Sequence, residues 1–372
     1  MKILSLMAPV KFGGGERLLL DQAKVFREKG IEYIVVCLND SSEFENHLKK
    51  ENIKYLKISN IKFKQTPTRK DYLFLLFKLI PKIFKLKNLI TKEKPDILLS
   101  HGFPTILLVP LSILFLKIKP KIFYVHHFQK QRENFLVRKI YLWFLKKYKK
   151  IIAVSSETAN SLKIVFPEIK DKVLSIPNGI DTKRFEIKET KEELRKKLNL
   201  PDGILGICVG RLVSFKNQKF LIKVAKEIKR DDFYILIIGD GDEYENLKKE
   251  IEKERLEDKV RLLGFIPSNE IPYYLKASDI FLYPSLKEGF GIVVLEAMAA
   301  GLPVVIFKEI YIEEFGENIL VANNEEEFIN YSKMLIENEV FRKELGKKLK
   351  QDVIKLDINK IIDNYLKIFE NG

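Results

Sequence analysis

Cysteine, histidine and tryptophan are scarce in this chain of 372 residues, which contains two, four and one of them. Cys37 and Cys208 each lie in an apolar, strand-like run, which favours two small buried hydrophobic side chains in a reducing compartment over a disulfide or a metal ligand. The histidines, at positions 47, 101, 126 and 127, are not at helical metal-ligand spacing, and no zinc or calcium signature occurs. We therefore expect no metal site.

Long apolar runs are also missing. The first ten residues, MKILSLMAPV, are too short an apolar run for a secretory signal and predict a first strand instead. The most apolar segment, residues 106–116, has 11 residues against the roughly 18 that span a bilayer, and Lys117 ends it. This segment predicts a buried helix, and we expect the chain in the cytoplasm.

Positive charge is concentrated in one part of the chain. Residues 61–150 hold 21 Lys and Arg against 4 Asp and Glu, a local net charge of +17, while the whole chain carries +15. Within this segment, residues 71–90 place apolar side chains at helical spacing between Lys78, Lys82, Lys85 and Lys87, and a second lysine cluster follows at 146–150. The pattern is typical either of a helix on an anionic membrane surface or of an ordinary solvated lysine face over a core. No nucleic-acid-binding module accompanies it, so nucleic acid is not expected as a partner.

Short β-branched runs alternate with amphipathic helical stretches, which is typical of parallel sheets with helices on both faces. The expected strands are 2–7, 33–38, 97–101, 122–126 and 151–155 in the first half, and 205–210, 234–239, 260–264, 280–284 and 304–307 in the second. Between the halves, Pro177, Asn178 and Gly179 begin a break that extends to about Leu200. The pattern therefore predicts two sheets joined by a linker at 176–200.

One phrase, YPSLKEGFGIVVLEAMAAGLPVV at 283–305, has the pattern of a ligand site. A β-rich run gives way to a glycine loop at Gly289 and Gly291 and then to a helix expected from about Ile292. Glycine lets the backbone approach a ligand closely, and a helix N-terminus favours an anion. Glu288 and Glu296 flank this loop, where both carboxylates could reach a polyhydroxylated ligand; taken alone, the pair would equally suit two solvated surface glutamates.

The same phrase resembles the Glu, seven residues, Glu motif of the retaining glycosyltransferases of family 4, together with the E-A-M-A-x-G-x-P-V that follows it in that family. Further matches occur in the family's order over nearly the whole chain: PVKFGGGER at 9–17, a strand-end histidine at 126, AVSSE at 153–157, IPNGID at 176–181, VGRLVSFKN at 209–217, IIGDG at 237–241 and LGFI at 263–266. The resemblance implies the α/β GT-B fold, in which two Rossmann-like domains face a cleft and the last helix crosses back onto the first domain. Residues 1–177 with a helix at about 355–372 would form the acceptor-side domain, and residues 178–354 the nucleotide-sugar-binding domain.

The resemblance assigns the nucleotide part of a donor site to the second domain. Arg211 and Lys216 follow the first strand of that domain and would stabilise the charge that builds on a nucleotide diphosphate as the glycosidic bond breaks. Phe265 and Ile266 lie where the family contacts the nucleobase. The implied donor is a nucleotide sugar, with a UDP- or GDP-sugar expected.

The sugar and ribose would be held by the phrase at 283–305. In the family, Glu288 and Gly289, with the N–H groups of Phe290 and Gly291, would hold the donor sugar. Glu296 would accept hydrogen bonds from the ribose hydroxyls.

The first domain contributes a glycine cluster and a histidine. Gly14 and Gly15, in a loop expected to precede a helix from about Glu16, would let backbone N–H groups approach the diphosphate or the acceptor, although a tight turn explains such glycines equally well. His126 matches the family's strand-end histidine, thought to contact the transferring sugar. Its neighbour His127 stands where relatives often have Asp or Asn, so the assignment stays open between the two.

The implied reaction transfers a glycosyl group from the nucleotide sugar to a hydroxyl acceptor with retention, and without a metal or another cofactor because Arg and Lys supply the positive charge. One departure concerns residues 308–316, KEIYIEEFG, where relatives commonly carry a glycine-rich turn and an acidic residue. A lipid-linked or cell-surface glycan acceptor, with the enzyme peripheral on the inner face of the cell membrane, is the hypothesis that the basic segment suggests. A nucleotide-sugar epimerase of the same fold and a non-catalytic membrane-associated binding protein remain the alternatives.

Overall fold

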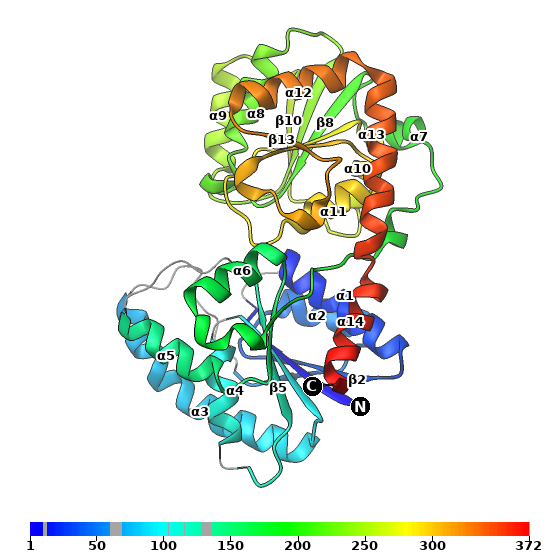
Figure 1. Ribbon diagram of the computed structural model, residues 1–372. Helices are drawn as coiled ribbons and strands as arrows, with labels where there is room; N and C mark the ends of the chain where they lie inside the picture. The colour runs from blue at the N-terminus through cyan, green and yellow to red at the C-terminus, as the bar shows by residue number, and fades with distance from the viewer. Residues whose placement is uncertain (10–12, 60–68, 103, 115, 128–134, 372) are drawn as a thin grey trace. The chain divides into compact units, whose positions relative to one another are not determined.

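The computed structural model describes residues 1–9, 13–59, 69–102, 104–114, 116–127 and 135–371, with the side chains of 69–78 and 135–137 left outside that description. It divides into two compact units, one formed by Met1–Gly179 with Ile358–Gly372 and the other by Ile180–Asp357. Each unit is an α/β layer structure built on one parallel sheet (Figure 1). The α/β class expected from the sequence is therefore confirmed.

The sheet of the first unit has seven strands in the order β3-β2-β1-β4-β5-β6-β7. Their bounds are β1 Lys2–Met7, β2 Glu32–Cys37, β3 Tyr55–Lys57, β4 Ile97–His101, β5 Lys121–His126, β6 Lys150–Ala153 and β7 Val173–Ser175. The helices are α1 Gly14–Glu28, α2 Ser42–Lys50, α3 Arg69–Glu93, α4 Thr105–Ile113, α5 Phe135–Leu145, α6 Ser156–Val165 and α14 Ile358–Asn371. The strands are continuous apolar runs because helices cover both faces of a parallel sheet.

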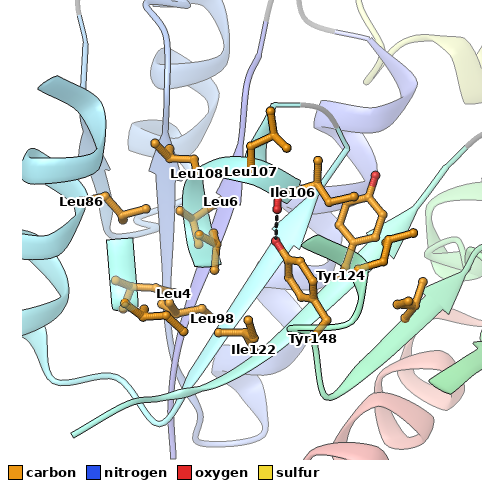
Figure 2. Packing of buried hydrophobic residues seen from close by; sticks show 14 of the residues in the cluster. Leu4, Leu6, Leu86, Leu98, Ile106, Leu107, Leu108, Ile122, Tyr124 and Tyr148 are labelled. Atoms are coloured by element: carbon orange, nitrogen blue, oxygen red, sulfur yellow. Dashed lines mark hydrogen bonds between the residues drawn. The ribbon is translucent and has the colours of Figure 1, made fainter. Parts of the chain in front are cut away.

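The core of this unit forms where α3, α4 and α5 meet the sheet. Leu4, Leu98 and Ile122 from three adjacent strands pack in one cluster with Leu86 of α3, and all four are almost fully buried (Figure 2). The apolar segment 106–116 supplies α4, whose residues from Thr105 to Ile113 are buried except Leu111. The expected buried helix is confirmed. None of the helices in the described part of the chain is both long and apolar enough to cross a bilayer.

The second unit has a six-stranded parallel sheet in the order β10-β9-β8-β11-β12-β13. Its strands are β8 Ile204–Val209, β9 Phe233–Ile238, β10 Val260–Gly264, β11 Ile280–Tyr283, β12 Val304–Phe307 and β13 Leu320–Ala322. Its α-helices are α7 Lys191–Lys197, α8 Lys219–Glu227, α9 Tyr244–Lys253, α10 Ile271–Ala277, α11 Ile292–Ala299, α12 Glu325–Glu337 and α13 Glu339–Asp352. The central pairing of β8 with β11 matters below, because it brings together two loops that are distant in sequence.

All ten strands expected from the sequence are present, within one or two residues at their ends. The three that were missed, β3, β7 and β13, have three residues each and lie at the edges of the sheets. A run of three residues carries too little periodicity to be recognised.

The linker expected at 176–200 is shorter than predicted, because α7 lies within it and belongs to the second unit. Thr190 and Glu193 form a capping box at the start of α7, and Arg195 ties the helix to Asp279 at 2.6 Å. At the other end of the unit the chain returns through α14, which packs on α1 of the first unit.

Two features of the first unit correct the sequence interpretation. Helix α1 begins at Gly14, so Gly14 and Gly15 form its first turn and only Gly13 caps it, with residues 10–12 outside the description. Lys82 does not belong to a solvated cationic face: it is 4% exposed, and its Nζ donates to Leu38 O and Asn39 Oδ1, both at 3.0 Å. Lys78 lies outside the described side chains.

Candidate active site

The carboxyl edge of the second sheet carries the second-unit candidate residues. The strands are parallel, so the segments that follow β8, β10 and β11 emerge at the same edge, which is where open α/β sheets bind ligands. Arg211 and Lys216 follow β8, Phe265 and Ile266 follow β10, and the loop from Pro284 to Gly291 follows β11.

The loop after β8 is held close to the backbone that follows β9. Leu212 N donates to Asp240 O at 2.9 Å, and Gly210 N donates to Ile238 O at 2.9 Å. A Cβ atom on Gly239 would lie 1.9 Å from Gly210 O, and one on Gly241 would lie 2.2 Å from Leu212 O. The IIGDG phrase therefore contains glycine because only glycine lets the two segments approach this closely.

Arg211 is exposed, and its guanidinium has no hydrogen bond or ion pair with any residue that the structure describes. Its backbone is fixed instead: the buried Gln218 donates from Nε2 to Arg211 O at 3.1 Å. An unpaired guanidinium on a fixed backbone is suited to bind an anion with little reorganisation.

Lys216, Tyr283 and Glu288 form a compact polar group. Lys216 Nζ donates to Tyr283 Oη at 2.5 Å and to Glu288 Oε1, and Tyr283 Oη donates to the same Oε1. The side chains of Lys216 and Glu288 are only 12% and 14% exposed. Glu288 thus has two donors on one carboxylate oxygen, which a surface glutamate would lack.

Burial determines the protonation of the neighbouring groups. Burial, together with the charge of Glu288, holds the pKa of the Tyr283 hydroxyl well above its usual range, so this hydroxyl remains a donor at neutral pH. Burial also raises the pKa of the Cys208 thiol to about 12, and Cys37 is affected in the same way. Both cysteines are buried, free thiols, as the sequence predicted.

The glycine loop leads directly into α11. Gly291, at φ 80°, occupies the left-handed region and caps the helix, which begins at Ile292 as expected. Phe290 is buried at 4% exposure with its ring 6.1 Å from that of Phe315, so the loop is anchored by packing. Gly289 precedes it, partly exposed.

Glu296 lies one turn into α11 and is half-buried. Its Oε1 is 3.9 Å from Nη1 of Arg184, whose Nη2 donates to Ser268 O at 2.9 Å. Arg184 belongs to a short 3₁₀ helix, Thr182–Phe185, that follows the IPNGID phrase.

Phe265 and Ile266 lie directly after β10, at the same edge of the sheet. Phe265 is 59% exposed and Ile266 is partly exposed, so the phenyl ring is available to a planar partner.

The first unit places its candidates at the carboxyl ends of its own strands. His126 ends β5, is 7% exposed, and lies with Nδ1 3.4 Å from Tyr124 Oη. Gly15 has no heavy atom within 4 Å of a Cβ position, so no close contact requires glycine there.

A hydrogen-bonded chain runs beside His126. His127 Nε2 lies 3.3 Å from His101 Nδ1, and His101 Nε2 lies 3.0 Å from Ser5 Oγ. Burial lowers the pKa of His127 to about 4, and burial with the neighbouring His127 lowers that of His101 well below its usual range. Both imidazoles are therefore neutral at physiological pH.

Three residues of these groups were missed by the sequence interpretation: Tyr283, Arg184 and His101. Tyr283 stands inside the quoted phrase, and His101 was recognised as a strand end, so position alone could have marked both. No signal in the sequence pairs Arg184 with Glu296, which are joined by folding. No group of three or more His, Cys, Asp or Glu within the described residues is arranged to hold a metal ion.

The family model for glycosyl transferases group 1 matches residues 190–352, and that for glycosyltransferase family 4 matches residues 12–184. The Escherichia coli protein named UDP-Gal:alpha-D-GlcNAc-diphosphoundecaprenol alpha-1,3-galactosyltransferase is 30% identical over 267 residues, which cover 68% of this chain and 67% of the relative. An uncharacterised glycosyltransferase of Haemophilus influenzae is 27% identical over 372 residues, 95% of each chain.

Among solved structures, that of Anabaena HepE in complex with UDP and glucose superposes with a TM-score of 0.85 at 21% identity, covering 100% of both chains. At this identity the likeness shows the fold alone, and it extends over both units. Together with the family models and the E. coli relative, it shows that the chain belongs to the group 1, family 4 glycosyltransferases of the GT-B fold.

Proposed function

We propose that this glycosyltransferase moves a sugar from a nucleoside diphosphate sugar to a hydroxyl acceptor with retention of the anomeric configuration. The observation that carries the proposal is the edge of the second sheet. There Arg211, whose guanidinium has no partner among the described residues, stands in the same loop as a lysine that is held against a carboxylate. Cations suit a diphosphate and carboxylates suit sugar hydroxyls. The names of relatives that contain UDP-Gal, or UDP with glucose, favour UDP as the nucleotide, with GDP as the alternative.

Arg211 and Lys216 would hold the diphosphate. Arg211 offers a planar fork of donors, while Lys216 offers a compact charge. In the absence of donor, Lys216 is neutralised by Glu288, so a diphosphate would take over part of that pairing as it binds. Charge building on the leaving diphosphate would then strengthen both contacts, which is how a site accelerates bond cleavage rather than merely binding. Two cations can fill this role without a metal.

The sugar and nucleoside would lie along the remaining segments of the edge. Glu288, and the N–H groups of Phe290 and Gly291 at the start of α11, would hold the sugar. Glu296 would accept hydrogen bonds from the ribose, with Arg184 holding its carboxylate in position. Phe265 and Ile266 would contact the base.

The first unit would supply the acceptor side. His126 at the end of β5 would contact the transferring sugar, and the free N–H groups at Gly14 and Gly15 would approach the diphosphate or the acceptor. No nucleophile is assigned. The leaving diphosphate would itself remove the acceptor proton on the face from which it departs, which retains the configuration. A lipid-linked or cell-surface glycan is the proposed acceptor class, as the diphosphoundecaprenol in the name of the E. coli relative suggests.

Calorimetric titration with UDP, GDP, ADP and their sugar conjugates tests the donor site. We expect saturable binding of one nucleotide, loss of that binding in an Arg211→Ala, Lys216→Ala double variant, and wild-type binding in a Lys347→Ala, Lys348→Ala control, which removes two exposed cations from α13. Absence of binding by all the nucleotides, or equal loss in the control, would refute the site. With an acceptor present, the anomeric configuration of the product, read by NMR coupling constants, tests retention.

A further inference from the structure

Helix α5 carries exposed apolar side chains on one face among the residues that the structure describes. Ile140 and Trp143 are 52% and 49% exposed, whereas Leu142 and Leu145 on the opposite side of the helix are buried in the core. Trp143 is the only tryptophan of the chain. A large aromatic side chain that is half in water is unusual for a helix with such a well-packed inner face.

Further exposed apolar side chains lie on α3 and just after α4. Ile80 and Phe84, one turn apart on α3, are 51% and 61% exposed, and Leu114 and Ile118, after α4, are 47% and 90% exposed. Helix α4 contacts both α3 and α5. We call these six residues, Ile80, Phe84, Leu114, Ile118, Ile140 and Trp143, the α3–α5 surface.

Lysines lie at the C-terminal end of α5, beside its exposed apolar side chains. Lys146 and Lys147 are exposed where the helix ends, and Lys147 Nζ lies 4.7 Å from the centroid of the Trp143 ring. Lys172 donates to Lys146 O at 2.7 Å, which adds a further cation from the next element. Glu168 lies close enough to Lys146 for their charges to interact, but its carboxylate is occupied by Arg138 at 2.8 Å.

The end of α5 is rigidly attached to the core. Tyr148 is fully buried, and its hydroxyl lies 3.2 Å from the carbonyl oxygens of both Thr105 and Ile106 in α4. Figure 2 shows the Tyr148 side chain beside Ile106 with one such hydrogen bond. The exposed side chains are therefore presented on fixed backbone.

We propose that the α3–α5 surface docks onto an anionic lipid bilayer, with Trp143 and Ile140 in the headgroup boundary and Lys146 and Lys147 on lipid phosphates. An aromatic anchor beside lysines is the composition that such a boundary favours. An ordinary solvated lysine face over a core would not expose six large apolar side chains. A second copy of the chain is also disfavoured as the partner, because the residues 61–150 of the two copies, each with a net charge of +17, would repel one another. The surface includes Ile80 and Phe84 of the segment 71–90 but not Lys82, which is buried. The residues of this surface lie outside the proposed transfer site.

Tryptophan emission of the whole protein tests the docking directly, since Trp143 is the only emitter of its kind. We expect a blue shift and co-sedimentation with vesicles of phosphatidylcholine containing phosphatidylglycerol, and neither with vesicles of phosphatidylcholine alone. Equal binding to both vesicles, an emission unchanged on the anionic ones, or a blue shift that follows protein concentration without vesicles would overturn the proposal, the last by showing that a second copy covers the surface.

Matched variants locate the contact. Lys146→Glu with Lys147→Glu should weaken vesicle binding by at least about tenfold, because each lysine near an anionic surface contributes substantially. Lys347→Glu with Lys348→Glu makes the same charge change on α13 and should leave binding as in the wild type. Ile140→Ser should reduce the blue shift, while Val340→Ser, at a side chain 68% exposed in the other unit, should not. Equal loss in the two charge-reversal variants would refute the assignment of the surface. Nucleotide binding by the Lys146, Lys147 variant should stay unchanged, which separates this test from that of the transfer site.

Discussion

Replacing Tyr283 with phenylalanine removes one oxygen from the centre of the proposed donor site. The ring is 1% exposed and stacks at 5.6 Å on Phe281, so the substitution should leave the packing in place. What it deletes is the hydroxyl that donates to Glu288 and accepts from Lys216. Tyr283 is thereby a positioning residue, one that acts through the two charged groups that it joins.

The size of the effect follows from the partners of the Glu288 carboxylate. A hydrogen bond to a charged group contributes about 1.5–3 kcal/mol, and about 1.4 kcal/mol corresponds to a tenfold change in binding. Without donor, Glu288 would keep Lys216 after the substitution. With either ligand bound, Lys216 would be shared with the diphosphate and Tyr283 would become the main donor to Glu288. Only the nucleotide sugar would also use the Glu288 carboxylate, through its sugar hydroxyls, so only its affinity would depend strongly on how Tyr283 positions that carboxylate. We therefore expect affinity for the nucleotide sugar to fall about tenfold or more, and affinity for the free nucleoside diphosphate to fall by less than about threefold.

Calorimetry with the two ligands measures this difference directly. Tyr365→Phe is the control, because it removes the same atom from an equally buried tyrosine of the first unit and should alter stability alone. An unchanged affinity for the nucleotide sugar, or an equal loss for both ligands, would refute the role given to Tyr283.

Three further outcomes concern stability. The Asp279 carboxylate is 10% exposed and pairs with Lys191 and Arg195, each at 2.6 Å, so Asp279→Ala should lower the free energy of unfolding of the second unit by about 3 kcal/mol. The Asp232 carboxylate is 51% exposed, so Asp232→Ala should cost under about 1 kcal/mol, as measured by denaturant titration. Gly346→Ala places a Cβ 2.1 Å from a backbone oxygen and should destabilise by about 2 kcal/mol, while Gly15→Ala, also in a helix but unobstructed, should stabilise by up to about 1 kcal/mol; the same sign for both would contradict the geometry. His127 stays neutral in the fold down to about pH 4, while the same side chain in the unfolded chain binds a proton below about pH 6.5. The free energy of unfolding should therefore fall as the pH is lowered from about 6.5 to 4, and it should fall less steeply in His127→Asn. Parallel curves of stability against pH for the two proteins would exclude this coupling.

The sequence predicted the two sheets well because buried parallel strands leave continuous apolar runs. The expected strands at 2–7, 97–101 and 260–264 match β1, β4 and β10 to the residue. Short edge strands such as β13 could not be predicted from the sequence, because three residues at the edge of a sheet do not make a recognisable periodic pattern. The start of α1 was also predicted too late, because Gly14 and Gly15 favour a loop by composition. In the structure they form the first helical turn, where the N–H groups have no helical partner.

Within the donor site, the sequence identified which residues carry charge but not what they bind in the protein. Lys216 and Glu288 were singled out one by one from motifs, and their contact depends on the pairing of β8 with β11, which places loops 72 positions apart side by side. The same holds for Arg184 and Glu296.

The sequence by itself determined the α/β class, the placement of the chemical motifs after strands, and membership of a glycosyltransferase family, because these depend on periodicity and on short contiguous phrases. Only the tertiary structure decided that Lys82 is a buried donor rather than a surface charge, that Tyr283 joins the two charged groups of the site, and that α5 exposes Trp143. The physical reason is that a local pattern specifies which face of an element is apolar, whereas burial and pairing depend on what packs against that face, and strand order sets this between residues far apart in the chain.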